Sequence, residues 1–207
     1  MKININKNEL RKASIFSLVM VLIVGMGYLT LEPAITKASA TANSSVNVNL
    51  SVDPTLSINT PTTVTMSPNI TGTGTSTGSA IWTVTTNSAS GWKLEVNASA
   101  SPAMVSGSNN FADYTEGVLG TPETWSVAAS AAEFGFTASG TFAESKYTSN
   151  KYQSFQGATK IQVSHSGTGP DAGDSTTVGF KAEVGASKSQ PTGSYQAVIT
   201  GTATSLP

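Results

Sequence analysis

Cysteine is absent from the 207 residues, and charged residues make up only 11% of them. A chain without cysteine forms no disulfides, so its stability has to come from a packed core. The single histidine, His165, also excludes a zinc site built from several cysteines and histidines. Beyond residue 40 the chain holds six lysines, ten acidic residues and no arginine, a net charge of −4. This balance excludes the basic surface that nucleic acid binding requires.

The N-terminal segment has the layout of a secretory signal peptide. Basic residues precede an apolar run from about Ile15 to Leu31, and Ala38-Ser39-Ala40 supplies the small residues that a signal peptidase needs. We therefore expect residues 1–40 to be a signal peptide cleaved after Ala40, and the product to be secreted, at the cell surface or in the extracellular space. The alternative is an uncleaved anchor, because roughly 17–25 apolar residues span a bilayer. This segment would then be the chain's contact with a membrane.

The stretch from Ile81 to Val96 organises the rest of the chain. Trp92, Leu94 and Val96 alternate with polar residues, and this period of two indicates a half-buried strand. The residues before it are rich in β-branched side chains and place Trp82 on the same face as Val84. The connection between the two arms has turn composition and ends at Gly91, which can adopt a positive φ. We predict a hairpin whose two tryptophans form the largest part of the core.

Similar alternation, separated by turn residues, recurs along most of the chain. It is visible over residues 46–52, 56–58, 161–163, 178–184 and 195–204. We predict an all-β protein, a single β-sandwich or jelly roll of about nine to eleven short and mostly antiparallel strands. The domain would cover residues 41–207, with long loops around 98–155, a short helix near 126–133 and a flexible connector over 69–79.

Two short stretches match the motifs of a known family. The first is Gly91-Trp92-Lys93-Leu94, and the second runs from Gly193 to Ala203. They resemble the WxL-domain proteins of Gram-positive cell surfaces, whose first motif is Gly-Trp-x-Leu and whose second, near the C-terminus, is roughly Gly-x-Tyr-x-Ala-x-Leu-Thr-Trp-x-Leu. The resemblance implies non-covalent association with peptidoglycan. It marks four motif residues: Trp92, Leu94, Tyr195 and Ile199.

The second motif departs from the family pattern at two positions. Gly201 stands where the family has its second tryptophan, and Ala203 stands where it has leucine. If these positions belong to the core, another side chain has to fill the space, and Trp82 and Trp125 are the candidates. If they belong to a wall-binding surface, that surface is damaged. For Trp92 we favour a core position, because large aromatic residues at alternating positions are usually buried.

Few residues suit catalysis, and we predict no enzyme, no cofactor and no metal. His165 with Asp171 or Asp174 has the composition of a Ser–His–Asp site, but no nucleophile-elbow pattern accompanies it. Asp171 and Asp174 are weak calcium candidates, and we favour solvated turn carboxylates because the distal glutamate of a calcium loop is missing. Two further carboxylate pairs have only the composition of a glycosidase site: Glu116 with Glu123, and Glu133 with Glu144.

Aromatic residues are scattered through the predicted long loops. Aromatic rings stack on sugars and anchor protein interfaces, but we favour the interpretation that these rings cover the ends of the sandwich. The six residues are Phe111, Tyr114, Phe142, Tyr147, Tyr152 and Phe155.

The sequence therefore predicts a non-enzymatic cell-surface β-sandwich, held non-covalently at the cell envelope for wall binding or adhesion. Its partner would be peptidoglycan or another cell-surface protein. The alternative is a structural subunit of an extracellular filament. In that case the apolar strand Val46–Val52 would pair with the open sheet edge of a neighbouring copy.

Overall fold

The computed structural model describes residues 7–29, 41–169 and 171–207. The chain divides into two units, residues 1–50 and residues 51–207. In the first unit, α1 (Lys7–Leu29) is a helix that contains most of the predicted apolar run. No helix in the described part of the chain combines the length and the apolar character needed to cross a membrane. The expected cleavage site, Ala38-Ser39-Ala40, lies outside the described residues.

The prediction of a strand at Val46–Val52 is wrong. These residues have no regular secondary structure, and the apolar side chains of Val46, Val48, Leu50 and Val52 are 77–87% exposed. The alternation correctly identifies which side chains would share a face of a strand. A strand also needs a neighbour that pairs with its backbone groups. Among the described residues, no strand pairs with this segment.

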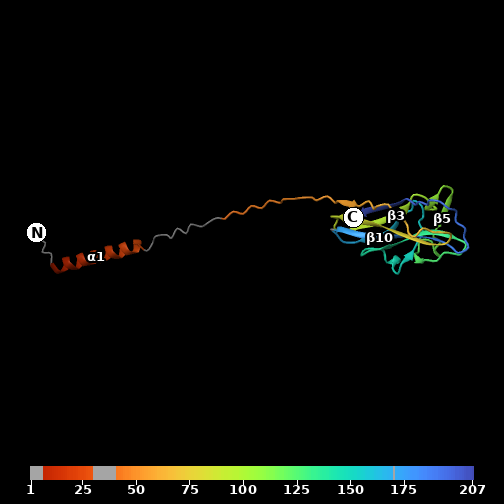
Figure 1. Cartoon of the computed structure of the whole chain (residues 1–207). Helices are drawn as coiled ribbons and strands as arrows, with labels where there is room; N and C mark the ends of the chain where they lie inside the picture. The colour runs from red at the N-terminus through yellow and green to blue at the C-terminus, as the bar shows by residue number, and fades with distance from the viewer. Residues whose placement is uncertain (1–6, 30–40, 170) are drawn as a thin grey trace. The chain divides into compact units, whose positions relative to one another are not determined.

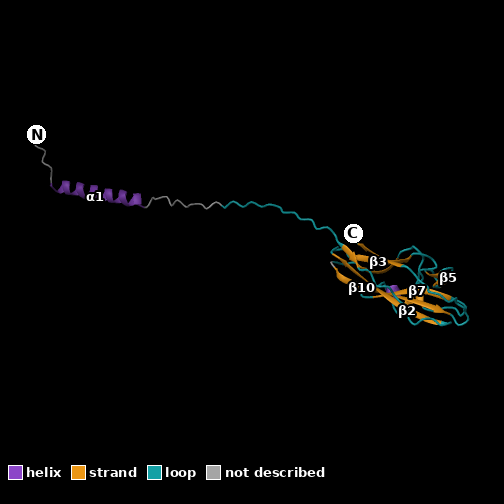
Figure 2. Ribbon diagram, turned by 45° about the horizontal axis from the view of Figure 1, so that its top comes forward, coloured by secondary structure: helices purple, strands orange, loops and turns teal. Residues whose placement is uncertain are grey.

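Residues 51–207 contain a β-sandwich, so the predicted all-β class is confirmed (Figures 1 and 2). The larger sheet has six strands in the order β1 (Leu56–Ile58), β2 (Gly74–Thr86), β10 (Asp171–Val184), β7 (Ala132–Ser139), β5 (Asn109–Asp113) and β4 (Met104–Ser106). The smaller sheet has the order β11 (Ile199–Ser205), β3 (Trp92–Ala98) and β9 (Ile161–Ser166). A two-stranded ribbon joins β6 (Glu123–Thr124) to β8 (Lys151–Tyr152). In the described part of the chain, β5 pairs with β7 in parallel and every other pairing of these strands is antiparallel.

The two large sheets enclose one apolar core. Trp92, Leu94 and Val96 of β3 are fully buried, as their alternation predicts. From β7, Phe136 stacks on Phe155 with ring centroids 4.3 Å apart. Every residue of the core cluster lies between Ile58 and Ala203. A chain that begins at Thr41 therefore retains the complete core.

β2 and β3 do not form the predicted hairpin. They belong to different sheets, so the connection from Asn87 to Gly91 crosses the sandwich instead of joining neighbouring strands. Gly91 does adopt a positive φ of 84°, and a Cβ there would collide with the carbonyl oxygen of Ser166. The alternation of apolar residues indicates which face of a strand is buried. It does not indicate which strand is the hydrogen-bonded neighbour.

Two smaller predictions also need correction. The predicted flexible connector over residues 69–79 ends early, because β2 begins at Gly74 and pairs with β10 from there. Backbone pairing with a long neighbouring strand outweighs the poor strand propensity of glycine and serine. The predicted helix near residues 126–133 is absent, and β7 begins at Ala132. In the described part of residues 51–207, the one helical turn is the 3₁₀ helix η1 (Ser145–Tyr147).

Candidate functional site

The two motif-bearing stretches lie side by side in the smaller sheet. β3 and β11 pair antiparallel, with Leu94 opposite Ala203, Val96 opposite Gly201 and Trp92 opposite Ser205. Strands that are a hundred residues apart in the chain thus form one continuous surface. Because side chains alternate along a strand, this surface has one apolar and one polar face.

The first motif faces the core. Trp92 and Leu94 are completely buried, and Trp92 meets Phe142 edge-to-face with ring centroids 6.1 Å apart. The interpretation of Trp92 as a core residue is therefore confirmed. Neither side chain reaches the surface, so a ligand on the surface of the domain does not touch them.

The two matched residues of the second motif are also part of the packing. Tyr195 meets Phe111 edge-to-face at a centroid distance of 5.0 Å, and its hydroxyl donates to the carbonyl oxygen of Pro191 at 2.7 Å. Ile199 begins β11 opposite Ala98 and packs partly buried against the core. Both residues hold the C-terminal strand in place.

Trp82 fills the space over Gly201, the position at which the WxL pattern has its second tryptophan. A Cβ at Gly201 would lie 2.5 Å from Nε1 and 2.8 Å from Cε2 of Trp82. Trp82 belongs to β2 in the opposite sheet and is only 5% exposed. Of the two candidates for this space, Trp82 is thus the one that fills it, and Trp125 lies elsewhere.

The opposite face of the motif strands is polar and lies toward solvent. Thr200, Thr202 and Thr204 of β11 stand opposite Asn97, Glu95 and Lys93 of β3. Lys93 and Glu95 form an ion pair with a distance of 3.1 Å between Nζ and Oε2. On the other side of β3, Lys93 stands opposite His165 and Glu95 opposite Gln162. We call the eight residues named here the polar sheet face.

Glu144 is the carboxylate next to His165. The distance between His165 Nδ1 and Glu144 Oε1 is 2.6 Å, and Gln162 Nε2 donates to the same oxygen at 2.7 Å. Burial alone raises the pKa of Glu144, but the hydrogen bonds from Gln162 and His165 outweigh it and the pKa is lowered. The acidic neighbour of His165 is therefore Glu144, at the edge of the polar sheet face, and not Asp171 or Asp174, which the sequence offered only by composition.

Asp171 and Asp174 do not lie on a turn as predicted. Both belong to the first residues of β10, where the pairing with β2 shifts register between them. A β-bulge of this kind turns neighbouring side chains away from regular alternation. In the described part of the chain, no three histidine, aspartate or glutamate side chains gather in a way that suits a metal ion.

The two candidate carboxylate pairs anchor loops. Glu116 is 7% exposed, and its Oε1 accepts hydrogen bonds from the Gly120 amide and the Ser154 hydroxyl, both at 2.9 Å. Glu133 accepts from the Thr115 amide at 3.1 Å, and burial is the main reason that its pKa is raised. Glu123 accepts a hydrogen bond from the hydroxyl of Tyr114. Glu133 thus ties the loop after β5 to the larger sheet, and Glu116 ties the same loop to the segment around Ser154.

The loop aromatics mostly cover the sandwich, as favoured from the sequence. Phe111, Tyr114, Tyr147 and Phe155 are buried, and Phe142 and Tyr152 are partly buried. A cluster that the sequence analysis missed surrounds Trp125. Its ring stacks on Tyr114 at 4.4 Å, its Nε1 donates to Glu183 at 2.7 Å, and Lys181 Nζ lies 5.1 Å from its centroid. These contacts join a loop to the face of β10 that points away from the core.

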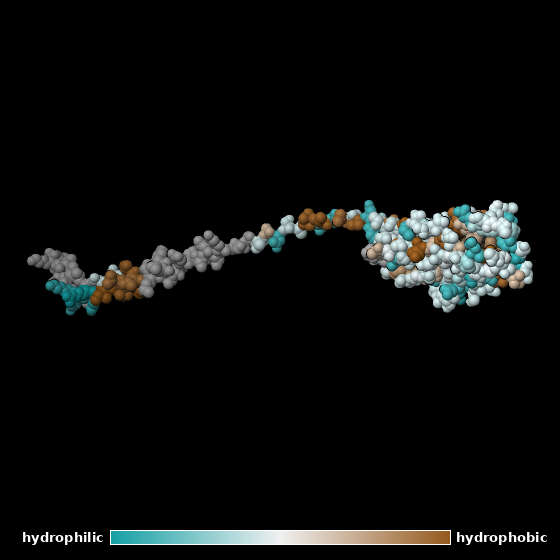
Figure 3. Space-filling view, viewed as in Figure 1, coloured by the Kyte–Doolittle hydropathy of each residue, from teal (hydrophilic) through white to brown (hydrophobic). Residues whose placement is uncertain are grey.

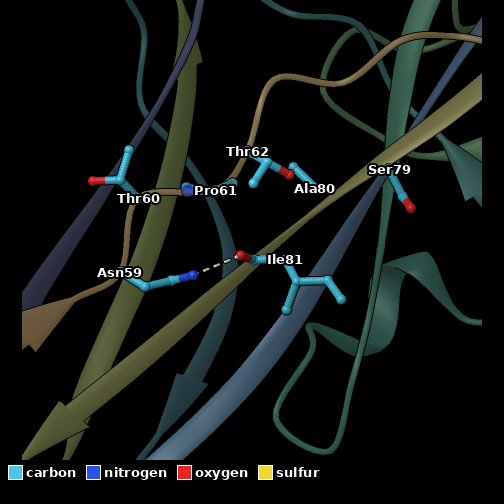
Figure 4. A pocket seen from close by; sticks show the side chains of 7 residues that line it. All are labelled: Asn59, Thr60, Pro61, Thr62, Ser79, Ala80 and Ile81. Carbon is cyan, nitrogen blue, oxygen red and sulfur yellow. Dashed lines mark hydrogen bonds between the residues drawn. The ribbon is translucent and has the colours of Figure 1, made fainter.

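A hollow of about 320 Å³ lies beside β2 (Figure 4). Asn59 Nδ2 donates across it to the carbonyl oxygen of Ile81 at 3.1 Å. The remaining lining residues are Thr60, Pro61, Thr62, Ser79 and Ala80. The lining contains no charged side chain, so the hollow offers no acid–base chemistry.

No protein-family model, no curated protein and no solved structure matches this chain. The resemblance to WxL-domain proteins therefore rests on the motif residues alone.

Proposed function

We propose that this chain is a non-enzymatic, exported β-sandwich protein that associates non-covalently with the cell envelope. The observation that carries the proposal is the arrangement of the motifs. Gly91-Trp92-Lys93-Leu94 and the C-terminal motif are neighbouring strands of one sheet, with Leu94 opposite Ala203. The N-terminal pattern of basic residues, apolar run and Ala38-Ser39-Ala40 supports export.

The polar sheet face is the surface that we assign to envelope binding. Trp92 and Leu94 are fully buried, so the motif shapes the sheet rather than touching a ligand. The outward neighbours of the same strands include a row of hydroxyls at Thr200, Thr202 and Thr204. Hydroxyl, amide and charged groups on a flat surface can donate to and accept from the many hydroxyls of a wall glycan. We expect peptidoglycan, rather than another surface protein, to be the partner.

Sedimentation with isolated cell walls tests this function. The chain from Thr41 to Pro207 is expected to bind walls saturably and to remain bound after the walls are treated with protease. The double substitution Thr200→Glu and Thr204→Glu is expected to weaken binding several-fold, because the new charges lose hydration in the contact. Loss of binding after protease treatment would instead identify a protein partner.

The matched control places the same charges on the other sheet. Ser79→Glu with Ala172→Glu adds two exposed carboxylates on strands β2 and β10 of the larger sheet, outside the polar sheet face. This variant is expected to bind walls like the unmodified chain. Equal weakening by both double variants, or no wall binding at all, would reject the assigned surface or the function itself.

A further inference from the structure

The segment Val46–Val52, called here the leader segment, has the pattern of a strand, and within residues 7–29, 41–169 and 171–207 no strand pairs with it. Val46, Val48, Leu50 and Val52 are 83%, 87%, 87% and 77% exposed, and polar residues alternate with them. Figure 3 shows hydrophobic residues gathered in the segment that leads into the β-sandwich, whereas the visible domain surface is mostly pale or hydrophilic. Exposed apolar residues in regular alternation mark an interaction site more often than an ordinary surface.

One edge of the sandwich has free backbone groups. The amide of Leu206 donates to Gly91 and the amide of Ser99 donates to Val198, each at 3.0 Å. In an antiparallel pair, every second residue of a strand exchanges hydrogen bonds with the partner strand. The two bonds show that in β11 the even-numbered residues are the ones that bond to β3. The backbone groups of the odd residues point to the other side of β11. These odd residues are Ile199, Gly201, Ala203 and Ser205. Among the described residues, no backbone group forms a hydrogen bond with their outward amides and carbonyls.

This edge also lacks the features that protect edge strands. Natural edges are shielded by lysine, proline, bulges or a covering segment, and β11 contains no charged residue and no proline. The edge strands β4 and β9 are each covered by a further bridge. Gln196 forms a bridge with Val105 of β4, and Ala143 forms a bridge with Ser164 of β9. β1 lies close to β11, but among the described residues no backbone hydrogen bond joins the two strands, so the hydrogen-bonding edge of β11 is open to an additional strand.

We propose that the leader segment of one copy pairs with the free edge of β11 in a second copy. The two segments match in length, seven residues each. They also match in polarity, because Val48 and Leu50 would extend the inward row of Ile199 and Ala203, while Asn47 and Asn49 would continue the threonines of the polar sheet face. Neither segment carries a charge that opposes pairing.

The connection between the leader segment and β1 favours a second copy over the same chain. Asn87 Oδ1 accepts from the Thr55 amide at 2.5 Å, and Asn87 Nδ2 donates to the carbonyl of Asp53 at 3.1 Å. Pro54 follows Asp53, and a residue before proline prefers an extended conformation. A sharp reversal at residues 53–55 would have to break these bonds. Each copy then gives one strand and accepts one, so that subunits join head to tail in a closed ring or an open chain.

The test compares two faces of the leader segment in the chain from Thr41 to Pro207, which retains the complete core. Sedimentation velocity over a range of concentrations is expected to show association of the unmodified chain. Val48→Lys with Leu50→Lys is expected to weaken association by at least about tenfold, because two apolar side chains no longer become buried. The matched control, Asn47→Lys with Asn49→Lys, adds the same charge on the polar face and is expected to associate almost normally.

A second pair of variants tests the acceptor edge. Ala203→Pro and Ser205→Pro each remove an outward amide while leaving the amides that pair with β3, and proline is tolerated at such edge positions. Both are expected to reduce association, and thermal unfolding identifies a variant that no longer folds. Ser205 is the last residue of β11. If Ala203→Pro does not fold, the association of Ser205→Pro still tests the acceptor edge.

Three results would overturn the proposal. They are a chain that stays monomeric at all concentrations, equal effects of the two lysine pairs, and rapid amide exchange of the leader segment inside the oligomer. The inference does not depend on wall binding. Assembly without walls and sedimentation with walls are measured separately, so either can fail alone.

Discussion

The indole of Trp82 lies against the backbone of Gly201 across the sandwich. A Cβ at position 201 would come within 2.5–2.9 Å of three indole atoms, Nε1, Cε2 and Cδ1. The two residues come from different sheets, β2 and β11. Because position 201 is a glycine, the large indole of Trp82 from the opposite sheet fits against the backbone there.

Gly201→Ala is expected to destabilise the domain. The added methyl group overlaps the Trp82 ring, and overpacking of this kind costs about 1–3 kcal/mol. Urea unfolding of the chain from Thr41 measures the loss. Gly167→Ala is the matched control, because nothing lies within 4 Å of a Cβ at that position. A similar cost at both glycines would mean that Trp82 does not set the requirement at 201.

Trp82→Ala is expected to cost about 3–5 kcal/mol, because it leaves a cavity in the core. The more informative measurement is the double variant with Gly201→Ala. Without the indole the new methyl group has space, so the cost of Gly201→Ala is expected to fall or change sign. Strict additivity of the two substitutions would contradict the contact as the source of the effect.

Glu144 is expected to contribute to the pH dependence of stability. Its pKa in the folded state is below its ordinary value of 4.5, so its contribution is present above that value and is lost as the pH falls through the folded-state pKa. Glu144→Gln should therefore flatten the fall in stability on the acid side of pH 4.5. The effect stays below about 1 kcal/mol because His165 is largely exposed.

The measurement is the free energy of unfolding in urea at several pH values between neutral and acid. His165→Ala removes one of the two hydrogen-bond partners of Glu144 and is expected to flatten the same region in part. Identical slopes for Glu144→Gln and the unmodified chain would contradict the role of the hydrogen bonds between Glu144 and its partners Gln162 and His165.

Tyr147→Phe is expected to cost about 1–3 kcal/mol. The Tyr147 hydroxyl donates to Gln153 Oε1 at 3.0 Å, and both residues are 2% exposed. Burial raises the pKa of Tyr147 far above its ordinary value, so the hydroxyl remains a donor. Removal of the hydroxyl leaves a buried oxygen of Gln153 without its donor.

Tyr195→Phe is the comparison for this substitution. Its hydroxyl donates to the carbonyl of Pro191 in an exposed position, where water can replace it. Thermal or urea unfolding should show a clearly smaller loss than for Tyr147→Phe. Equal losses would mean that burial of the hydrogen bond does not determine its contribution.

The sequence by itself determined the class of fold and the face that each strand buries. Alternation in Trp92, Leu94 and Val96 predicted their burial, because a period of two places every second side chain on one side of a strand. The absence of cysteine excludes disulfides, and the few basic residues lead us to expect no nucleic acid binding.

Tertiary structure decided which segments meet. Alternation does not specify a partner strand, so β2 and β3 were predicted as a hairpin although they lie in separate sheets. The contact of Trp82 with Gly201 and the ion pair of His165 with Glu144 join residues that are far apart in the chain. The first contact follows from the packing of the two sheets, and the second from the pairing of the segment around Ala143 with β9; local sequence encodes neither. The same reason explains Val46–Val52: its pattern suits a strand, but pairing requires an open neighbouring edge, and only the folded sandwich shows where such an edge lies.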